Sequence, residues 1–216
     1  MKSALLGATG FVGTALLHEA LTRGHHVTAL VPDPATVPTA NNLLTVVQGD
    51  VYQPEQLAGK LAGHDLVLSA FNPGWSNPDL YNAFLAGSRF IEQATAQAGV
   101  SRLLVSGGAG SLFIDGHQLV DGPEFPAEYK QGASAARDYL AELRKNTQLD
   151  WTFFSPAIEM HPGIDTGRTG QYRLGTESPV FNAEGRSFLS VQDLAGAVLD
   201  EVAQPQFSRQ RFTAAY

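Results

Sequence analysis

The stretch Gly7-Ala8-Thr9-Gly10-Phe11-Val12-Gly13 decides the fold of this 216-residue chain. A short apolar run at residues 3–6 precedes it, and residues 12–23 follow it with apolar side chains at helical spacing. A strand that ends at Gly7 and a helix that begins near Phe11 must reverse direction within a few residues, which glycine permits at little steric cost. The pattern is typical of the strand, tight turn and helix at the front of a Rossmann-type α/β domain.

Each glycine has its own part in this turn. Gly7 permits the reversal, Gly10 lets the backbone approach a pyrophosphate, and Gly13 lets the helix pack closely on the strand. The phosphate would meet the helix N-terminus, where unpaired N–H groups favour an anion. We therefore predict a dinucleotide site with contacts from Gly7, Thr9, Gly10, Phe11, Val12 and Gly13. The alternative is a glycine turn that serves the fold alone.

The composition excludes several classes of protein. The formal net charge is −7 and no basic cluster is visible, which argues against a nucleic-acid partner. Cysteine is absent, so disulfides, thiolate metal sites and cysteine nucleophiles are excluded. Apolar residues make up 44% of the chain, but no run reaches the roughly 18 residues that a membrane span requires. We expect one cytoplasmic domain over residues 1–216 that acts on a small molecule.

Short apolar runs alternate with amphipathic stretches along the first 154 residues, which predicts strand–helix–strand crossovers. Such crossovers build a doubly wound parallel sheet with helices on both faces. The expected strands are residues 3–6, 27–31, 43–47, 66–69, 103–106 and 151–154, and the clearest helices are 12–23, 78–98 and 129–145.

The organisation changes after Trp151. Glycine, proline and turn residues crowd positions 161–175, and residues 182–185 are typical of a hairpin turn between two short strands. Residues 190–193 resemble a capping box that opens a helix ending near Ala203, and a last strand is expected at 211–214. We interpret residues from about 155 to 216 as a small subregion on the substrate side of the nucleotide crevice.

Further cofactor contacts are expected where the third and fourth strands end. Asp50 could accept from an adenine amino group while the backbone of Val51 contacts the ring; the alternative is that Asp50 caps the next helix. Ser69, Ala70 and Phe71 follow the fourth strand and would lie under the adenosine and its ribose. Open α/β sheets bind ligands at the carboxyl ends of their strands.

Several motifs together resemble a known family. The chain is similar to the atypical short-chain dehydrogenase/reductases, in the NADH-flavin reductase group, which is related to the flavin and biliverdin-IXβ reductases. The resemblance covers nearly the whole chain. It rests on residues 7–13, 102–112, 125–130, 150–157, 170–175 and 190–195.

This resemblance implies a doubly wound fold that binds NAD(P)H along one edge of the sheet, with a substrate pocket over the nicotinamide. Ser155, Pro156 and Ala157 look like the segment that contacts the nicotinamide, at the end of the sixth strand. Ser106, Gly107 and Gly108 would line the same pocket from the fifth.

The end of the second strand bears on cofactor choice. Relatives that prefer NADP(H) often carry an arginine there for the 2′-phosphate, and this chain has Pro32 instead. NAD-specific relatives place an acid at the very end of that strand, where this chain has Leu30 and Val31; Asp33 falls late for that role. The resemblance favours NADP(H) slightly over NAD(H).

The acid–base pair of catalytic short-chain dehydrogenases is missing. Those enzymes use Tyr-x-x-x-Lys, because one helical turn places the ammonium beside the phenol and lowers the pKa of that phenol. A carbonyl reductase needs such a proton donor, whereas a flavin spreads the charge it gains with hydride and takes its proton from solvent. Tyr216 is last in the sequence, and the fourth residues after the other tyrosines are Gln56, Leu85, Ala133, Leu143 and Thr176.

Several residues are candidates for the acceptor side of the pocket. Trp75, Phe113 and Tyr129 could stack on a flat ring, although ordinary loop packing accounts for each of them taken singly. Tyr129 and His161 are candidate proton donors, with a satisfied loop histidine as the alternative for the latter. No His/Asp/Glu spacing suggests a metal site. The residues expected on the substrate side are Asn72, Trp75, Phe113, Tyr129 and Lys130.

Three functions fit this sequence to different degrees. The first is an NAD(P)H-dependent reductase of a flavin (FMN or FAD), a quinone or a similar conjugated acceptor. The second is a non-catalytic NAD(P)-binding redox sensor that reports through a protein partner. A sugar-nucleotide epimerase or isoflavone-type reductase ranks lower, because it needs the missing Tyr/Lys pair or a compensating lysine. The fold alone does not decide among them.

Overall fold

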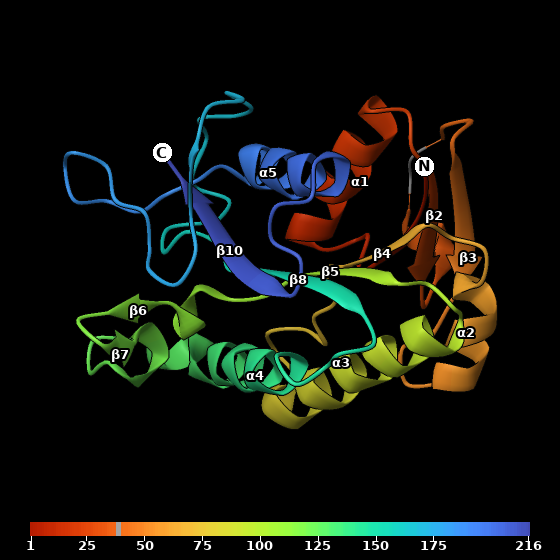
Figure 1. Ribbon diagram of the computed structural model, residues 1–216, viewed down its shortest axis with the longest axis horizontal. Helices are drawn as coiled ribbons and strands as arrows, with labels where there is room; N and C mark the ends of the chain where they lie inside the picture. The colour runs from red at the N-terminus through yellow and green to blue at the C-terminus, as the bar shows by residue number, and fades with distance from the viewer. Residues whose placement is uncertain (38–39) are drawn as a thin grey trace.

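An eight-stranded sheet runs through the molecule in the order β3-β2-β1-β4-β5-β8-β10-β9 (Figure 1). The computed structural model describes residues 1–37 and 40–216. Neighbouring strands from β3 to β10 are parallel, and β9 pairs antiparallel with β10. The strands are β1 (Lys2–Leu6), β2 (His26–Val31), β3 (Leu44–Gln48), β4 (Leu66–Ser69), β5 (Arg102–Ser106), β8 (Asp150–Phe154), β9 (Arg173–Gly175) and β10 (Gln210–Ala215). A separate hairpin pairs β6 (Phe113–Ile114) with β7 (His117–Gln118).

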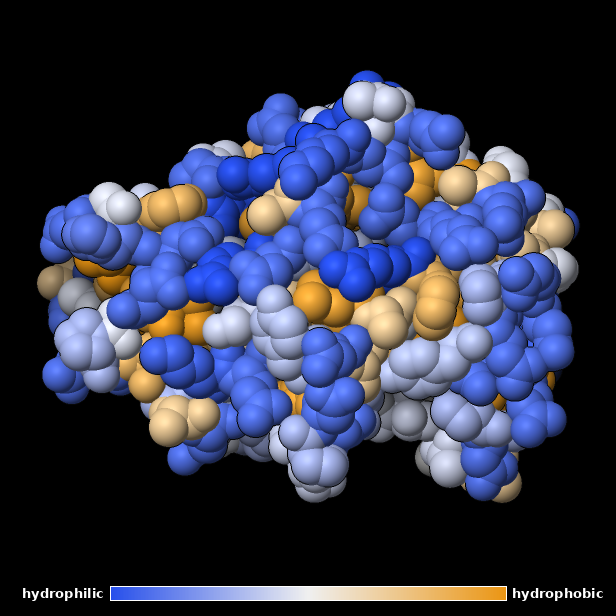
Figure 2. Space-filling model, turned by 90° about the horizontal axis from the view of Figure 1, so that it is seen from below, coloured by the Kyte–Doolittle hydropathy of each residue, from blue (hydrophilic) through white to orange (hydrophobic). Residues whose placement is uncertain are grey.

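Helices cover both faces of the sheet, as Figure 1 shows. On one face lie α1 (Phe11–Thr22) and α5 (Val191–Ala203). On the other lie α2 (Pro54–Leu61), α3 (Leu80–Gln97) and α4 (Ala127–Leu143), whose outer surface is largely hydrophilic with scattered hydrophobic groups (Figure 2). Short 3-10 turns are η1 (Pro34–Thr36), η2 (Ala109–Ser111) and η3 (Leu119–Asp121).

Successive side chains of a strand point to opposite faces, which explains the continuous apolar runs. In β1, Leu5 joins the core under α1 and α5, whereas Ala4 and Leu6 join the core under α2, α3 and α4. Both cores are therefore built from the same strands. The fold class is the doubly wound parallel α/β sheet that the sequence predicted. Among the helices that the structure describes, none is long and apolar enough to cross a membrane.

The predicted strands all lie within one residue of the observed ones, and the three predicted helices within two residues at each end. Ser190 caps α5 through the N–H of Asp193, at 3.1 Å. The predicted hairpin was wrong. Asn182 does organise a turn, because its side-chain oxygen accepts from Glu184 and Arg186, but no strands flank that turn. The backbone beyond the turn pairs elsewhere, since Phe188 bridges to Glu159.

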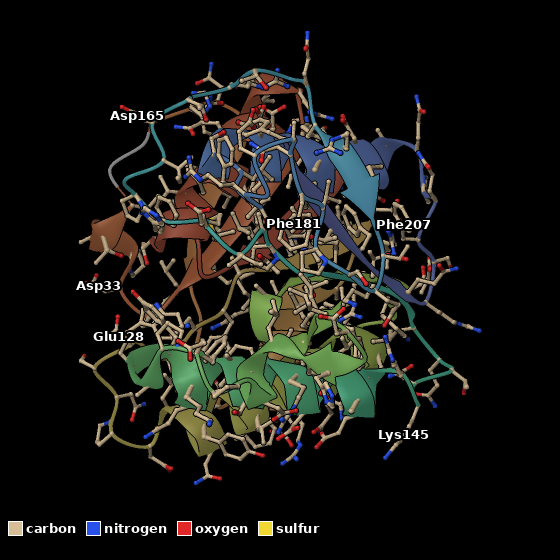
Figure 3. All side chains as sticks on the ribbon, turned by 90° about the vertical axis from the view of Figure 1, so that its left-hand side faces the viewer. Asp33, Glu128, Lys145, Asp165, Phe181 and Phe207 are labelled. Atoms are coloured by element: carbon tan, nitrogen blue, oxygen red, sulfur yellow. The ribbon has the colours of Figure 1, made fainter. Side chains whose placement is uncertain are left out.

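The carboxyl ends of the parallel strands meet along one edge of the molecule. Figure 3 shows Asp33, Glu128 and Asp165 on this edge and Lys145 and Phe207 on the opposite one. The chain leaves β1 in one direction towards β2 and β3, and later returns on the other side of β1 to β4 and β5. This reversal of strand order is the switch point at which open α/β sheets bind ligands.

Candidate cofactor and acceptor site

The glycine turn after β1 lies at the switch point, and two of its glycines are required by the chain itself. Gly7 has φ +77°, and a Cβ there would lie 2.3 Å from the carbonyl oxygen of Ala70. A Cβ at Gly13 would lie 1.9 Å from the carbonyl oxygen of Gly7. A side chain at either position would clash with backbone, so these two glycines are explained by the fold.

Gly10 is different, because the fold does not require a glycine there. Its backbone is extended, with φ −77° and ψ 170°, which any residue can adopt. A Cβ at this position would meet only the carbonyl oxygen of Gly7, at 3.4 Å. A side chain at position 10 would therefore be accommodated by the protein, and the pyrophosphate contact of Gly10 stays a prediction.

The first turn of α1 offers backbone donors next to Gly10. The N–H of Gly10 donates to Gly7 at 3.1 Å, and the helical ladder begins with the N–H of Thr14, which donates to Gly10 at 2.9 Å. The N–H groups of Phe11, Val12 and Gly13 precede that ladder, and the described residues provide no side-chain cap for α1. Three donors at a positive helix terminus suit an anion. Thr9 and Phe11 are exposed beside them.

Asp50 and Val51 lie just past the end of β3. The Asp50 side chain accepts the N–H of Tyr52 at 2.9 Å, so it holds the turn that leads to α2. Val51 packs partly buried against the core under α2 and α3. The geometry accounts for Asp50 as a turn residue and leaves its contact with adenine as a prediction.

The residues after β4 present backbone to the same edge. Ala70 lies against Gly7, and the buried Ser69 hydroxyl accepts the N–H of Phe71 at 3.5 Å. The Phe71 ring points away into α3, where a Cβ at Gly87 would lie 2.4 Å from it. Phe71 therefore offers its backbone, and not its ring, to the edge.

The ends of β5 and β8 lie side by side, with Ser106 paired to Phe154. A Cβ at Gly107 would lie 1.9 Å from the Phe153 ring, so packing requires this glycine, whereas a Cβ at Gly108 would make an ordinary 3.5 Å contact with Ala136. Pro156 and Ala157 are buried directly after β8. The structure thus brings together the two segments that were expected to line the nicotinamide end.

A buried polar group lies under these segments, and sequence reasoning missed it. The hydroxyls of Ser111 and Ser155 are 3.2 Å apart, and the Arg211 guanidinium donates to the Ser111 hydroxyl at 3.1 Å. Burial lowers the pKa of Arg211, while the neighbouring Glu177 carboxylate acts in the opposite direction. The one available signal was an arginine in the last strand, β10, next to the apolar Phe212.

Trp75 and Tyr129 meet at this edge although 54 residues of sequence separate them. Their rings are 5.5 Å apart and nearly perpendicular, and the side chains are 59% and 48% exposed. Asn72 shapes the loop before Trp75, because its side chain accepts the N–H of Gly74 at 2.8 Å. Lys130 is exposed next to Tyr129, in the first turn of α4. Four of the five expected substrate-side residues therefore belong to two adjoining segments.

Phe113 and His161 contact other groups than that aromatic pair. Phe113 packs under the Arg211 guanidinium, 5.7 Å from ring centre to the guanidinium carbon. His161 is exposed in the loop after β8, where its Nδ1 accepts the N–H of Gly163 at 3.1 Å. This local bond fits the satisfied loop histidine that the sequence left open as an alternative.

Several tyrosine hydroxyls elsewhere in the described chain are bound to carboxylates, whereas Tyr52 donates to the backbone carbonyl of Ala83. Tyr81 donates to Asp138, and Tyr172 to Asp200; these bonds contribute to a raised pKa of each phenol, with burial the larger cause for Tyr172. Burial and Glu92 together raise the pKa of Tyr139 well above its ordinary value. A lysine beside a tyrosine would instead lower the pKa of the phenol.

The loop between β8 and β9 is tied to the helices beside the glycine turn. Arg168 forms two hydrogen bonds with the buried Glu19 of α1, which lowers the pKa of Glu19, and Arg23 binds the same carboxylate. Asp193 of α5 accepts the N–H groups of Thr169 and Gly170. In residues 1–37 and 40–216, no group of three His, Asp or Glu side chains could hold a metal ion.

Comparison with known proteins agrees with this geometry. The chain belongs to the NAD(P)H-binding family, whose model matches residues 7–205. It is 37% identical over 216 residues to the uncharacterized protein YwnB of Bacillus subtilis, covering 99% of this chain and 97% of that protein.

Two solved structures are similar to this chain in both sequence and fold. A protein of Bacteroides thetaiotaomicron, provisionally named an epimerase, is 41% identical with a TM-score of 0.92, covering 100% of this chain and 96% of that one. A protein of Streptococcus pneumoniae, provisionally named an NADH-flavin reductase, is 35% identical with a TM-score of 0.86, covering 100% and 99%. The resemblance to the atypical short-chain dehydrogenase/reductases is confirmed, and the chain has the fold of NAD(P)H-binding oxidoreductases.

Proposed function

We propose that this protein is an NAD(P)H-dependent reductase that passes hydride to a flavin, a quinone or a similar conjugated acceptor. The observation that carries the proposal is that the fold does not require glycine at position 10, where a Cβ would meet only the carbonyl oxygen of Gly7 at 3.4 Å. A close approach of pyrophosphate to the backbone would explain this glycine. The free N–H groups of Phe11, Val12 and Gly13 would hold that group. In this proposal, residues 155–216 form the substrate side of a single domain.

The chain's own residues have a limited set of tasks in this reaction. A bound nicotinamide supplies hydride from its C4. Backbone at Ser106–Gly108 and Ser155–Ala157 would shape the space for that ring, and the rings of Trp75 and Tyr129 would orient a flat acceptor by contact. Solvent can supply the proton that the reduced acceptor takes up, so the site needs no arranged acid.

Two hollows elsewhere on the described surface do not suit this function. They have volumes of about 330 and 610 Å³ and share Tyr172, beside α5 and β9. The Asp200 carboxylate in the first is already bound by Tyr172 and Arg23. We place the dinucleotide on the open carboxyl edge because the free helix N–H groups lie there.

Oxidation of NADPH and NADH, followed by their absorbance, tests the proposal. We expect purified protein to oxidise either nucleotide when FMN or a quinone is added, and to leave a simple aliphatic aldehyde unreduced. Tight dinucleotide binding without turnover of any conjugated acceptor would favour the redox sensor instead. Epimerisation of a sugar nucleotide would contradict both; the Bacteroides relative is named only as an epimerase.

Cofactor choice is expected to depend on Pro32, which is exposed just after β2. The neighbouring Asp33 accepts the N–H of Ala35 at 3.0 Å, so this carboxylate caps η1. Because Asp33 has this capping role and Leu30 and Val31 are apolar, the end of β2 offers no acid of the kind that NAD-specific relatives use. NADP(H) therefore remains the modestly favoured cofactor. Pro32→Arg should raise NADPH affinity selectively, about tenfold or more, since a charge-assisted contact contributes about 1.5–3 kcal/mol. Calorimetric titration of both nucleotides measures this, and an equal gain for NADH would show that position 32 does not face the 2′-phosphate.

Tyr129→Phe tests whether the protein supplies the proton. The variant keeps the ring and loses only the hydroxyl, so we expect turnover of FMN to stay within roughly tenfold, whereas loss of a general acid costs about 10²–10⁴-fold. Trp75→Ala should reduce turnover more, because it removes the larger ring of the pair. A thousandfold loss in Tyr129→Phe with normal dinucleotide binding would make Tyr129 the proton donor and return carbonyl reduction to first place.

A further inference from the structure

Gly132 lies in the interior of α4, where glycine weakens a helix. A Cβ there would come within 2.9 Å of Cζ3 and 3.2 Å of Cη2 of Trp75, and within 3.3 Å of Leu80. The edge of the indole therefore occupies the place of the missing side chain. Gly59, inside α2, has no neighbour within 4 Å of its own would-be Cβ, so helical glycines in this chain are not always filled in this way.

The docked indole remains largely accessible. Trp75 is 59% exposed although the edge of its ring rests on α4. Gly74, with φ +102°, and the Asn72 hydrogen bond to its N–H shape the loop that carries Trp75 across to the helix. Tyr129, one turn earlier in α4, makes an edge-to-face contact with Trp75 and so holds the indole from a second direction.

The two rings lie beside the end of β5. Gly108 faces α4 at Ala133 and Ala136, and Tyr129 is one helical turn before Ala133. The exposed part of the Trp75 ring therefore borders the space beyond the end of β5, and Gly132 determines where that ring lies.

We propose that Gly132 is a specificity-determining residue. It positions Trp75 so that the rings of Trp75 and Tyr129 form one side of the binding site for an extended planar acceptor. This inference rests on the proposed function and deepens it by naming the acceptor class: fused, flat ring systems of the isoalloxazine type in preference to single-ring quinones. A fused system covers more of an indole than a single ring does, so its binding depends more on the position of Trp75. Gly132 touches no acceptor and acts only through Trp75.

Gly132→Ala tests the inference, with Gly59→Ala as the matched control in α2. The added methyl meets side chains and not backbone: it comes closest to the exposed Trp75 ring, and the buried Leu80 lies 3.3 Å away, so we expect the variant to fold. The chain has two tryptophans, and Trp151 is only 2% exposed, so quenching of fluorescence by acrylamide reports on Trp75. A Trp75→Phe protein supplies the Trp151 background.

We expect Gly132→Ala to change the quenching of Trp75 and to weaken FMN binding, measured as the Kd from fluorescence titration, by about two- to tenfold, the range of a lost aromatic contact. The KM for single-ring benzoquinone and the affinity for NADPH should stay unchanged, and Gly59→Ala should behave as wild type. Unchanged quenching, an unchanged FMN Kd, or an equal loss with benzoquinone would each overturn the proposal. A wild-type protein that binds FMN but does not reduce it would contradict the proposed function alone, because the Kd comparison would still decide the part of Gly132.

Discussion

Replacement of Gly10 by valine is expected to abolish NAD(P)H binding while the chain still folds. The backbone at this position is extended and its would-be Cβ meets only one atom, so valine fits the protein. Its methyl groups would instead fill the space in front of the N–H groups of Phe11 and Val12. Loss of two charge-assisted hydrogen bonds, at about 1.5–3 kcal/mol each, weakens binding by more than about a hundredfold. Calorimetric titration measures the loss, and circular dichroism checks the fold.

Two other glycines provide the controls. Gly59→Val adds the same side chain to α2, where no atom lies within 4 Å of the Cβ, and should bind NAD(P)H as wild type does. Gly13→Val should destabilise the protein itself, because its Cβ would lie 1.9 Å from the Gly7 carbonyl oxygen. A folded Gly10→Val protein with unchanged affinity would mean that the turn serves the fold alone.

Asp193→Ala is expected to cause the largest loss of stability. The Asp193 carboxylate is fully buried and accepts hydrogen bonds from Thr169, Gly170 and Tyr216. The bonds from Thr169 and Gly170 hold the loop between β8 and β9 to α5. Removal of this single buried acceptor leaves the part-buried donors of Thr169, Gly170 and Tyr216 without their partner, at about 1–3 kcal/mol each. We expect the free energy of unfolding to fall by about 3–5 kcal/mol in chemical denaturation.

Asp200→Ala on the same helix is the control, because its side chain is 60% exposed and its bonds with Arg23 and Tyr172 lie at the surface, where an ion pair contributes no more than about 1 kcal/mol. The pH dependence gives a second check. Burial raises the pKa of Asp193, but the hydrogen bonds from Thr169, Tyr216 and Gly170 outweigh it, and the net pKa lies below the ordinary value of 3.8. A lowered folded pKa stabilises the protein above pH 3.8, and that stability is lost as the pH falls through the folded value.

Asp193→Ala should therefore remove part of the acid sensitivity of wild type. An equal decline of both proteins below pH 3.8 would show that Asp193 is not the group concerned.

The sheet could be predicted because its strands are buried on both faces. Such strands appear as short apolar runs, and the helices between them carry a regular apolar stripe. Helix α2 was harder to recognise, since its eight residues span barely two turns. The antiparallel β9 has three residues, two of them exposed, so no alternation marks it. The backbone beyond residues 182–185 pairs with a distant segment, at Phe188 and Glu159, which local turn chemistry does not reveal.

The cofactor side of the site was more predictable than the acceptor side. The glycine turn is local, so its spacing alone carries the information, and the structure separates the glycines that the fold requires from Gly10. The acceptor side combines residues far apart in sequence, such as Trp75 with Gly132 and Ser111 with Arg211. A mid-helix glycine and a buried arginine were the available signals, and each has meaning only once its partner is known.

An anaerobic single-turnover experiment tests the central claim most directly. NADPH that carries deuterium at the transferred C4 position is mixed with the protein and FMN, and the loss of NADPH absorbance and of FMN absorbance are followed together. Direct hydride transfer predicts that both decays share one rate, that deuterium slows that rate severalfold, and that Gly10→Val abolishes it. FMN that stays oxidised while NADPH is bound, or a reduction rate that neither deuterium nor Gly10→Val changes, would contradict the account.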